Sequence, residues 1–251
     1  MGEDPRVRRR TAVIAVTLVT AVGALTQCAA RPVATEPATT PVTTSPAPTT
    51  TSTSPVTTSA APPQAARAAE VAAVSTADLG ASWRPGCPID PAQLRRVDLD
   101  YIGFDGQTQR GSLIVNAELV GPVIDVFEEL YRLRYPIEKM RTVEQYRDAD
   151  DELSMADNNT SAFNCRDIPG TGCWSWHASG RAIDINPLLN PYIDARGGFQ
   201  PANAGPYLDR TRADPGLLHD GDPAVLAFTD RGWRWGGHWR TPIDYQHFEL
   251  P

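Results

Sequence analysis

The sequence predicts an α+β domain in which helices pack on a small, mostly antiparallel sheet. Residues 97–104 and 111–116 predict two strands around the turn-like segment DGQTQR. Residues 117–135 repeat apolar side chains at helical spacing, and residues 245–250 alternate side-chain type as a strand does. Helices that pack on a mostly antiparallel sheet make the α+β class.

Both predicted helices carry recognisable ends. Asn116 is placed to cap the helix over 117–135, and a proline near its start is tolerated in the first turn. The second helix lies in residues 222–232, with Asp222 as N-cap, a proline at the first helical position and Gly232 beyond the end. Three shorter segments are further strand candidates: 138–146, 161–166 and 181–186.

Residues 1–27 predict an export signal. Residues 1–10 are polar and basic, and residues 11–26 are an almost unbroken run of small and apolar side chains. This order is typical of secretory signals. The apolar run is shorter than the roughly 20 residues that a permanent membrane span needs. A short transmembrane anchor is the alternative interpretation.

Cys28 follows the apolar run directly, in ALTQC. This context resembles a bacterial lipoprotein signal, in which the cysteine becomes the lipidated first residue. Gln27 departs from the small residue that such signals prefer before the cysteine. The two expectations are therefore a lipid-anchored cell-envelope protein and a freely secreted one.

The rest of the chain divides into a tether and one domain. Residues 28–75 are rich in Pro, Thr, Ser and Ala, so they cannot bury enough apolar surface to fold and predict a disordered tether. Residues 76–251 are long enough for one domain with its own core. Residues 1–75 carry six arginines and four acidic residues, so the net charge of −7 for the whole chain leaves −9 on the domain. This negative charge argues against partners such as nucleic acid or anionic lipid. We also expect the domain to be a monomer.

Three cysteines lie in the predicted domain, at positions 87, 165 and 173. An exported protein meets oxidising conditions in which disulfides persist. We expect Cys165 and Cys173 to pair, because they would close a small loop just ahead of His177, and we expect Cys87 to be left over.

An unusual polar pattern surrounds His177 in CWSWHASGRAIDINP. On a strand over 181–186, alternation puts two isoleucines on the core face and Asp184 on the other face, where a carboxylate is costly unless it is paired or metal-bound. Gly180 lets the chain turn tightly, so His177 can fold back over the strand. If the last strand pairs beside this one, His247 joins the same group.

Two imidazoles and one carboxylate are a usual ligand set for catalytic zinc, which keeps a fourth position open. Zinc polarises a carbonyl and lowers the pKa of water. Asp244, three residues before His247, is placed to act as the base. A structural hydrogen-bonded pair of the first imidazole and the carboxylate is the alternative, and His219 and His238 compete as ligands.

Two separated segments resemble motifs of the zinc D-alanyl-D-alanine carboxypeptidases of peptidase family M15. SWHASGRAIDIN is similar to S-x-H-x-x-G-x-A-x-D-[IL], and WRWGGHW…DYQHFE is similar to the closing W-G-G-x-W…[DE]-x-x-H-F. The resemblance covers about residues 138–251. The family includes vancomycin-resistance-type carboxypeptidases and L-alanyl-D-glutamate endopeptidases, and it shares its fold with Hedgehog signalling domains. The resemblance implies this fold and a Zn²⁺ ion held by His177, Asp184 and His247.

The resemblance also implies roles for residues around the ion. Asp244 would be the catalytic base, at a position where many members have Glu. Arg166 is the best match to a family arginine that steadies the oxyanion or the substrate carboxylate, although the usual Gly-Tyr-Arg context is absent, and Arg147 is the second choice. Ser175 matches a serine that contacts substrate or supports the first histidine, with plain turn chemistry as the alternative.

Residues 190–216 are a long polar insertion that we expect to form one wall of a cleft. Its candidates for substrate contact are Tyr192, Arg196, Arg210 and Arg212. The expected function is zinc-dependent hydrolysis of an amide bond in peptidoglycan stem peptides, first as a D-alanyl-D-alanine carboxypeptidase. The alternatives are an L-alanyl-D-glutamate-type endopeptidase and a non-catalytic, zinc-bearing module that binds the cell wall.

Overall fold

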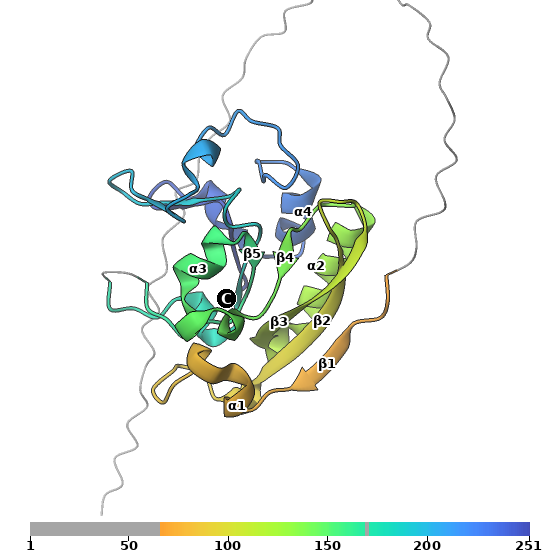
Figure 1. Cartoon of the computed structure of the whole chain (residues 1–251), viewed down its shortest axis with the longest axis vertical. Helices are drawn as coiled ribbons and strands as arrows, with labels where there is room; N and C mark the ends of the chain where they lie inside the picture. The colour runs from red at the N-terminus through yellow and green to blue at the C-terminus, as the bar shows by residue number, and fades with distance from the viewer. Residues whose placement is uncertain (1–65, 169–170) are drawn as a thin grey trace, which may run out of the picture.

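The computed structural model describes residues 66–168 and 171–251, and it has the α+β architecture that the sequence predicts (Figure 1). The strands are β1 Glu70–Ala73, β2 Leu94–Ile102, β3 Thr108–Asn116, β4 Lys139–Met140, β5 Asn159–Thr160, β6 Ala182–Asp184, β7 Tyr192–Ile193, β8 Phe199–Gln200, β9 Arg234–Trp235, β10 Ile243–Asp244 and β11 His247–Glu249. The α-helices are α1 Thr76–Leu79, α2 Val120–Arg132, α3 Asp151–Ala156 and α4 Pro223–Thr229. The sheets have the orders β1-β2-β3, β10-β7-β8 and β6-β11-β9, all antiparallel, and β4 pairs with β5 in parallel.

The long hairpin of β2 and β3 forms the main core together with α2. The hairpin confirms the first two predicted strands, with Leu94 opposite Asn116 at one end and Ile102 opposite Thr108 at the other. Helix α2 lies behind the hairpin in Figure 1. The side chains buried between them include Val97, Leu99, Leu113 and Val115 from the hairpin and Val123, Val126, Phe127 and Leu130 from the helix.

A smaller sheet, β6-β11-β9, carries the candidate site. Ile183, Phe248 and Trp235 connect this sheet to the main core. Phe248 stacks on Phe228 of α4, with ring centroids 3.9 Å apart. Because side chains alternate along a strand, the core packing of Phe248 and Ile183 turns their sequence neighbours to the opposite face.

The first predicted helix is confirmed with different ends. Ala117–Leu119 form a 3₁₀ turn ahead of α2, and Oδ1 of Asn116 accepts a hydrogen bond from the amide of Glu118 at 3.0 Å, as a cap does. Arg134 has a φ of 54°. This left-handed conformation ends the helix before residue 135, the predicted end.

The second predicted helix is confirmed as α4, which is shorter than the predicted segment. Asp222 precedes it, but its carboxylate accepts from the amide of His219 at 2.8 Å and does not cap the helix. Gly232 has a φ of 86° beyond the helix end, in the conformation that favours glycine.

The shorter strand candidates are confirmed only in part. Residues 181–186 contain β6, whereas residues 138–146 contain only the two-residue β4 before a 3₁₀ turn. The strand predicted over 245–250 is confirmed as β11. Residues 161–166 form no named strand, because two of their amides donate to the carbonyls of Ile114 and Ser82 in different parts of the chain. Strand periodicity does not reveal a segment whose hydrogen bonds are divided in this way.

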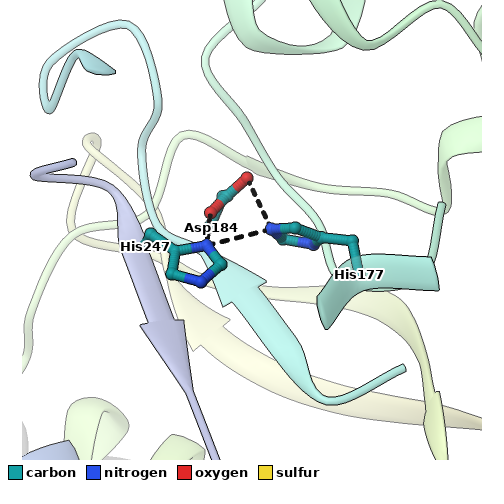
Figure 2. A group of neighbouring side chains, drawn as sticks. All are labelled: His177, Asp184 and His247. Atoms are coloured by element: carbon teal, nitrogen blue, oxygen red, sulfur yellow. Dashed lines mark hydrogen bonds and ion pairs between the residues drawn. The ribbon is translucent and has the colours of Figure 1, made fainter. Parts of the chain in front are cut away.

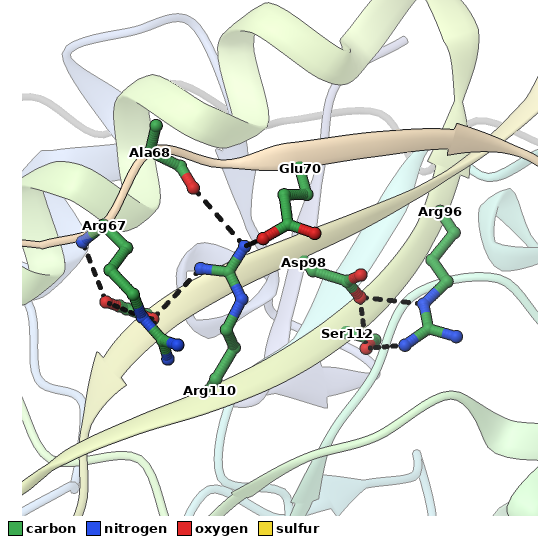
Figure 3. Close-up of polar contacts among 8 residues, drawn as sticks. Arg67, Ala68, Glu70, Arg96, Asp98, Arg110 and Ser112 are labelled. Carbon is green, nitrogen blue, oxygen red and sulfur yellow. Dashed lines mark hydrogen bonds and ion pairs between the residues drawn. The ribbon is translucent and has the colours of Figure 1, made fainter.

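The folded part begins before residue 76, the predicted boundary. Strand β1 pairs with β2, and Arg67 donates to the carboxylate of Asp100 from its backbone amide at 2.8 Å and from its guanidinium at 2.9 Å (Figure 3). The prediction that the tether extends to residue 75 is therefore wrong. All side chains of β1 are exposed, so its composition shows no sign of burial and pairing with β2 decides its structure.

The disulfide within the described residues joins Cys87 to Cys165, whose Cα atoms are 5.9 Å apart. The predicted pairing of Cys165 with Cys173 is wrong, and so is the expectation that Cys87 is left over. The amide of Cys165 donates to Ser82, and Arg84 donates to the carbonyl of Cys165 at 2.5 Å. These contacts hold two segments together that lie 78 residues apart, which closeness in sequence does not predict.

The predicted export signal over 1–27, the lipidation at Cys28 and the tether up to residue 65 lie outside the described residues. Within residues 66–168 and 171–251, none of the helices has the length and apolar character needed to cross a bilayer.

Candidate metal centre

His177, Asp184 and His247 come together as the sequence predicts (Figure 2). Nε2 of His177 lies 3.1 Å from Oδ2 of Asp184, and Nδ1 of His247 lies 3.2 Å from Oδ1 of Asp184. The two imidazole nitrogens are 3.1 Å apart. All three residues are buried, and they converge from a 3₁₀ turn and two neighbouring strands.

His177 is positioned by the 3₁₀ turn Trp176–Ser179. Ser175 precedes the turn, and its Oγ accepts from the amide of His177 at 3.3 Å, which is turn chemistry. Gly180 ends the turn with a φ of 67°, and its carbonyl accepts from the amide of Asn116 at 2.9 Å. A Cβ on Gly180 would lie 2.6 Å from that amide nitrogen, so both the backbone angle and the approach to β3 require glycine.

Strand register holds Asp184 and His247 together. They are direct partners in the antiparallel pair of β6 and β11, and Ile183 lies opposite Phe248 in the same ladder. The apolar pair enters the core and the polar pair faces the other way, because side chains alternate along each strand. The core therefore fixes the separation between the carboxylate and the imidazole.

The outer nitrogen of each imidazole has a hydrogen-bond partner. Nδ1 of His177 lies 2.5 Å from the carbonyl oxygen of Ala162, and Nε2 of His247 lies 3.3 Å from Oε2 of Glu249. An acceptor at the outer nitrogen favours the proton there and leaves the inner lone pair facing the centre. Trp239 packs beside His247, with ring centroids 5.4 Å apart.

The donor set fits a zinc ion. Histidine and carboxylate ligands bind zinc at about 2.0–2.2 Å, so two ligands of a tetrahedral site lie roughly 3.3 Å apart. The three separations of 3.1, 3.1 and 3.2 Å are close to this value. Asp184 makes its two contacts with different oxygens, and either oxygen can supply the third bond.

The charges at the centre suit a cation. Burial disfavours the charged form of Asp184, but His177 and His247 outweigh burial and lower the pKa of this carboxyl, so it is ionised. Burial also lowers the pKa of His247, but hydrogen bonds with Asp184 and Glu249 raise it to about 10. A bound cation takes the place of the proton that these acceptors attract.

Asp244 lies beside the centre on β10. A Cβ on Gly236 would lie 2.5 Å from the carbonyl oxygen of Asp244, so the glycine allows a close approach between the two segments. Burial and the charge of Asp184 raise the pKa of Asp244 to about 7. The positive charges of His247 and Arg166 oppose this shift. Oδ1 of Asp244 is buried and has no hydrogen-bond partner among the described residues.

Arg166 is near enough to the centre to interact with its charges. Burial lowers the pKa of Arg166, but Asp151 and the two aspartates of the site together raise it. Its Nε lies 2.9 Å from Oδ2 of Asp151. Arg147, the second choice, has a side chain that is 83% exposed and contacts Asp148 at 3.8 Å. These positions favour Arg166.

Neither competing histidine joins the centre. His219 contacts Asp222 at 3.2 Å, and His238 contacts Asp220 at 2.7 Å. A pocket of about 410 Å³ is lined by His219 and Tyr135 among others, and none of the three converging residues borders it.

The long polar insertion brings one of its candidates next to the centre. Tyr192 lies on β7 opposite Asp244 of β10, and burial together with the charge of Asp244 raises the pKa of this tyrosine. Arg210 instead donates to the carbonyls of Leu189 and Leu218 and packs on the ring of Tyr245 at 4.3 Å, so it stabilises the insertion. The remaining candidates are Arg196, which is exposed, and Arg212, which pairs with Asp214.

Sequence reasoning did not assign roles to three residues that surround the centre. Glu249 follows His247 by two positions, so strand alternation indicates that it shares the same face. Ala162 acts through its carbonyl, which leaves no trace in side-chain type. Asp151 lies on α3, and no fixed spacing connects it to Arg166.

The comparison with known families matches residues 169–250 to a family model described as D-alanyl-D-alanine carboxypeptidase. The match covers about a third of the printed chain and includes His177, Asp184, Asp244 and His247, whereas Arg166 lies ahead of it. Neither a curated protein nor a solved structure matches significantly. Residues 169–250 are therefore similar to the M15 peptidase family.

Proposed function

We propose that this chain is a zinc-dependent peptidase that hydrolyses peptidoglycan stem peptides, with removal of a C-terminal D-alanine as its activity. The observation that carries the proposal is the convergence of His177, Asp184 and His247 within the segment that matches the M15 family. The donor types, their separations and the ionised carboxylate support Zn²⁺ as the cofactor.

Asp244 is the proposed catalytic base. When bound, zinc supplies a Lewis acid that polarises the scissile carbonyl and lowers the pKa of water. Asp244 takes the proton of the attacking water and returns one to the leaving amine. Its pKa of about 7 and its buried Oδ1, which lacks a partner among the described residues, support this role. Tyr192 lies opposite Asp244, and we assign it to substrate contact together with Ser175.

Arg166 offers the cation that a carboxypeptidase would need. Release of a terminal residue requires a cation for its free carboxylate, whereas a cut inside a peptide does not. Nε of Arg166 faces Asp151 in an ion pair and has no other partner among the described residues, so the ion pair leaves both Nη atoms for substrate. Its donors therefore remain for a carboxylate or for the charge that develops on the carbonyl oxygen.

We propose that the protein is exported and acts in the cell envelope. The basic and apolar segments of residues 1–27 support export, and Cys28 supports a lipid anchor, with free secretion as the other route. The domain would act there as a monomer.

Metal content and product mass test the proposal. Purified protein should hold one zinc ion per chain, and a chelator should abolish hydrolysis until zinc is restored. Stem peptides that end in D-alanyl-D-alanine should lose one alanine. A cut between L-alanine and D-glutamate would instead support the endopeptidase, and bound zinc without any cut would support the wall-binding module. Full hydrolysis by zinc-stripped protein would contradict the proposal.

Replacement of Asp244 tests its role as the base separately from the binding of zinc. Asp244→Asn should lower kcat by about 10²–10⁴-fold, the usual contribution of a general base, while zinc content stays unchanged. Asp125→Asn, on the exposed side of α2, is the matched control and should keep full activity. An Asp244→Asn enzyme with unaltered kcat would remove Asp244 from the mechanism.

A further inference from the structure

We propose that Glu249 is a positioning residue that fixes the tautomer and orientation of His247 as a metal ligand. This inference rests on the proposed zinc function. Glu249 is 7% exposed, and its Oε2 lies 3.3 Å from Nε2 of His247. The opposite nitrogen of the ring, Nδ1, lies 3.2 Å from Asp184 and 3.1 Å from His177. The ring therefore lies between an outer carboxylate and the centre.

The chemistry of imidazole gives this contact its consequence. A neutral imidazole carries one N–H, and only its other nitrogen can offer a lone pair to a metal. An ionised carboxylate accepts hydrogen bonds and donates none. The N–H of His247 therefore belongs on Nε2, facing Glu249, and the lone pair of Nδ1 faces the centre. Without that acceptor, both tautomers become available and the ring is less well oriented to bind a metal.

The two imidazoles of the centre have different outer acceptors. Nδ1 of His177 meets the neutral carbonyl of Ala162, whereas Nε2 of His247 meets a carboxylate. A negative acceptor raises the basicity of the ligand nitrogen more than a neutral one does. Glu249 therefore gives His247 a kind of support that His177 lacks.

The position of Glu249 is itself fixed by its neighbours. It lies on the central strand β11, opposite Ala182 of β6 on one side and Arg234 of β9 on the other. Nη1 of Arg234 lies 3.7 Å from Oε1 of Glu249, so the two carboxylate oxygens face different partners. The arginine is 56% exposed. It offsets the charge of a buried carboxylate from the solvent side without contacting the centre.

Zinc affinity tests the inference separately from catalysis. The zinc dissociation constant of the full domain is measured by competition with a chromogenic chelator. Glu249→Ala should weaken binding by about 10–100-fold, the usual effect of losing an outer acceptor of a ligating histidine. Glu249→Gln keeps an acceptor oxygen but loses the charge. The zinc affinity of this variant should therefore lie between those of wild type and Glu249→Ala. Glu144→Ala removes a half-buried carboxylate elsewhere and should leave the zinc affinity unchanged.

The tautomer of His247 provides a second measurement. In zinc-loaded wild type, NMR should show an Nε2 proton of His247 that is protected from solvent exchange by its hydrogen bond with Glu249. Glu249→Ala should shift this signal and speed its exchange, while the Nδ1 proton of His177 stays the same. A structural role alone would leave the signal in place.

The outcomes distinguish the inference from the function on which it rests. If wild type binds no zinc, the proposed function fails. If wild type binds zinc and Glu249→Ala binds it equally well with an unchanged Nε2 proton signal, this inference alone is overturned. Circular dichroism checks the fold of each variant. If Glu249→Ala does not fold, Glu249→Gln decides, and an unchanged dissociation constant in that variant overturns the inference.

Discussion

Asp151 forms an ion pair with Arg166, the residue that we propose binds the substrate anion. Asp151 holds Nε of Arg166 at 2.9 Å, and its other oxygen accepts from Asn164 at 3.4 Å. One carboxylate therefore connects α3 to the segment that bears the arginine. A guanidinium held at Nε keeps its orientation while its other donors stay available.

Asp151→Asn should lower kcat/KM on a D-alanyl-D-alanine peptide by about 10-fold or more, because small misplacements of a charged group cost large factors in rate. Zinc content should not change. Asp148→Asn is the control, because that side chain is 88% exposed and contacts Arg147 instead. Equal kcat/KM values for wild type and Asp151→Asn would show that Arg166 needs no anchor.

The sequence predicted the three candidate metal ligands, but it did not predict the residues that hold the site in place. His177 lies in a 3₁₀ turn and Asp184 lies on the strand that follows it, so their spacing in the sequence determines how close the two side chains are. His247 could be added because the last strand alternates like its neighbour. Asp151 and Ala162 meet the site through irregular segments, and no periodicity connects them to their partners.

At the scale of elements, strand β1 depends on a cluster of ion pairs on the outer face of its sheet (Figure 3). The side chain of Asp100 is 1% exposed and binds both Arg67 and Arg110. Arg110 also contacts Glu70 of β1 at 2.9 Å. Because β1 buries none of its own side chains, these contacts and the pairing with β2 hold it in place.

Asp100→Asn should lower the Tm by several degrees at pH 7, since a domain of this size loses about 2–4 °C for each kcal/mol. Burial raises the pKa of Asp100, but hydrogen bonds from Arg67 and Arg110 lower it overall. The stabilisation is therefore fully present above the unfolded pKa of about 3.9 and is lost as the pH falls through the lower folded value. The difference in Tm between wild type and Asp100→Asn should shrink below about pH 4.

Glu128→Gln, on an exposed position of α2, is the control for this measurement. A Tm difference that is absent at pH 7, or that grows in acid, would contradict the role given to Asp100.

Local patterns predicted the β2–β3 hairpin and α2, because each is complete within a short stretch of sequence. Strand β1 was not predicted, because it is held in place by contacts with Asp100 and Arg110, which lie on other strands.

Across the whole molecule, the bond between Cys87 and Cys165 joins the N-terminal turns to the segment just ahead of Arg166. Both cysteines belong to a second apolar cluster with Leu79, Leu94 and Phe163. Sequence alone could not choose this pairing, because three cysteines in one domain allow several connectivities and the observed one follows from packing.

Loss of this disulfide should reduce the free energy of unfolding by about 4.5 kcal/mol, the value for a closed loop of nearly eighty residues. Chemical unfolding of Cys87→Ala, Cys165→Ala and the double variant measures it. Each single variant already breaks the bond, so the double variant should cost little more than either one. Independent, additive losses from the two single variants would contradict a bond between them.

The Arg67–Asp100 contacts have a mechanical consequence. A pull that acts on Arg67 is passed to Asp100 of β2 by these contacts and by the β1–β2 pairing. That load passes into the three-stranded sheet β1-β2-β3, whereas His247 and Asp184 belong to the separate sheet β6-β11-β9. Asp184 and His247 therefore lie on strands other than those that first receive a force applied at Arg67.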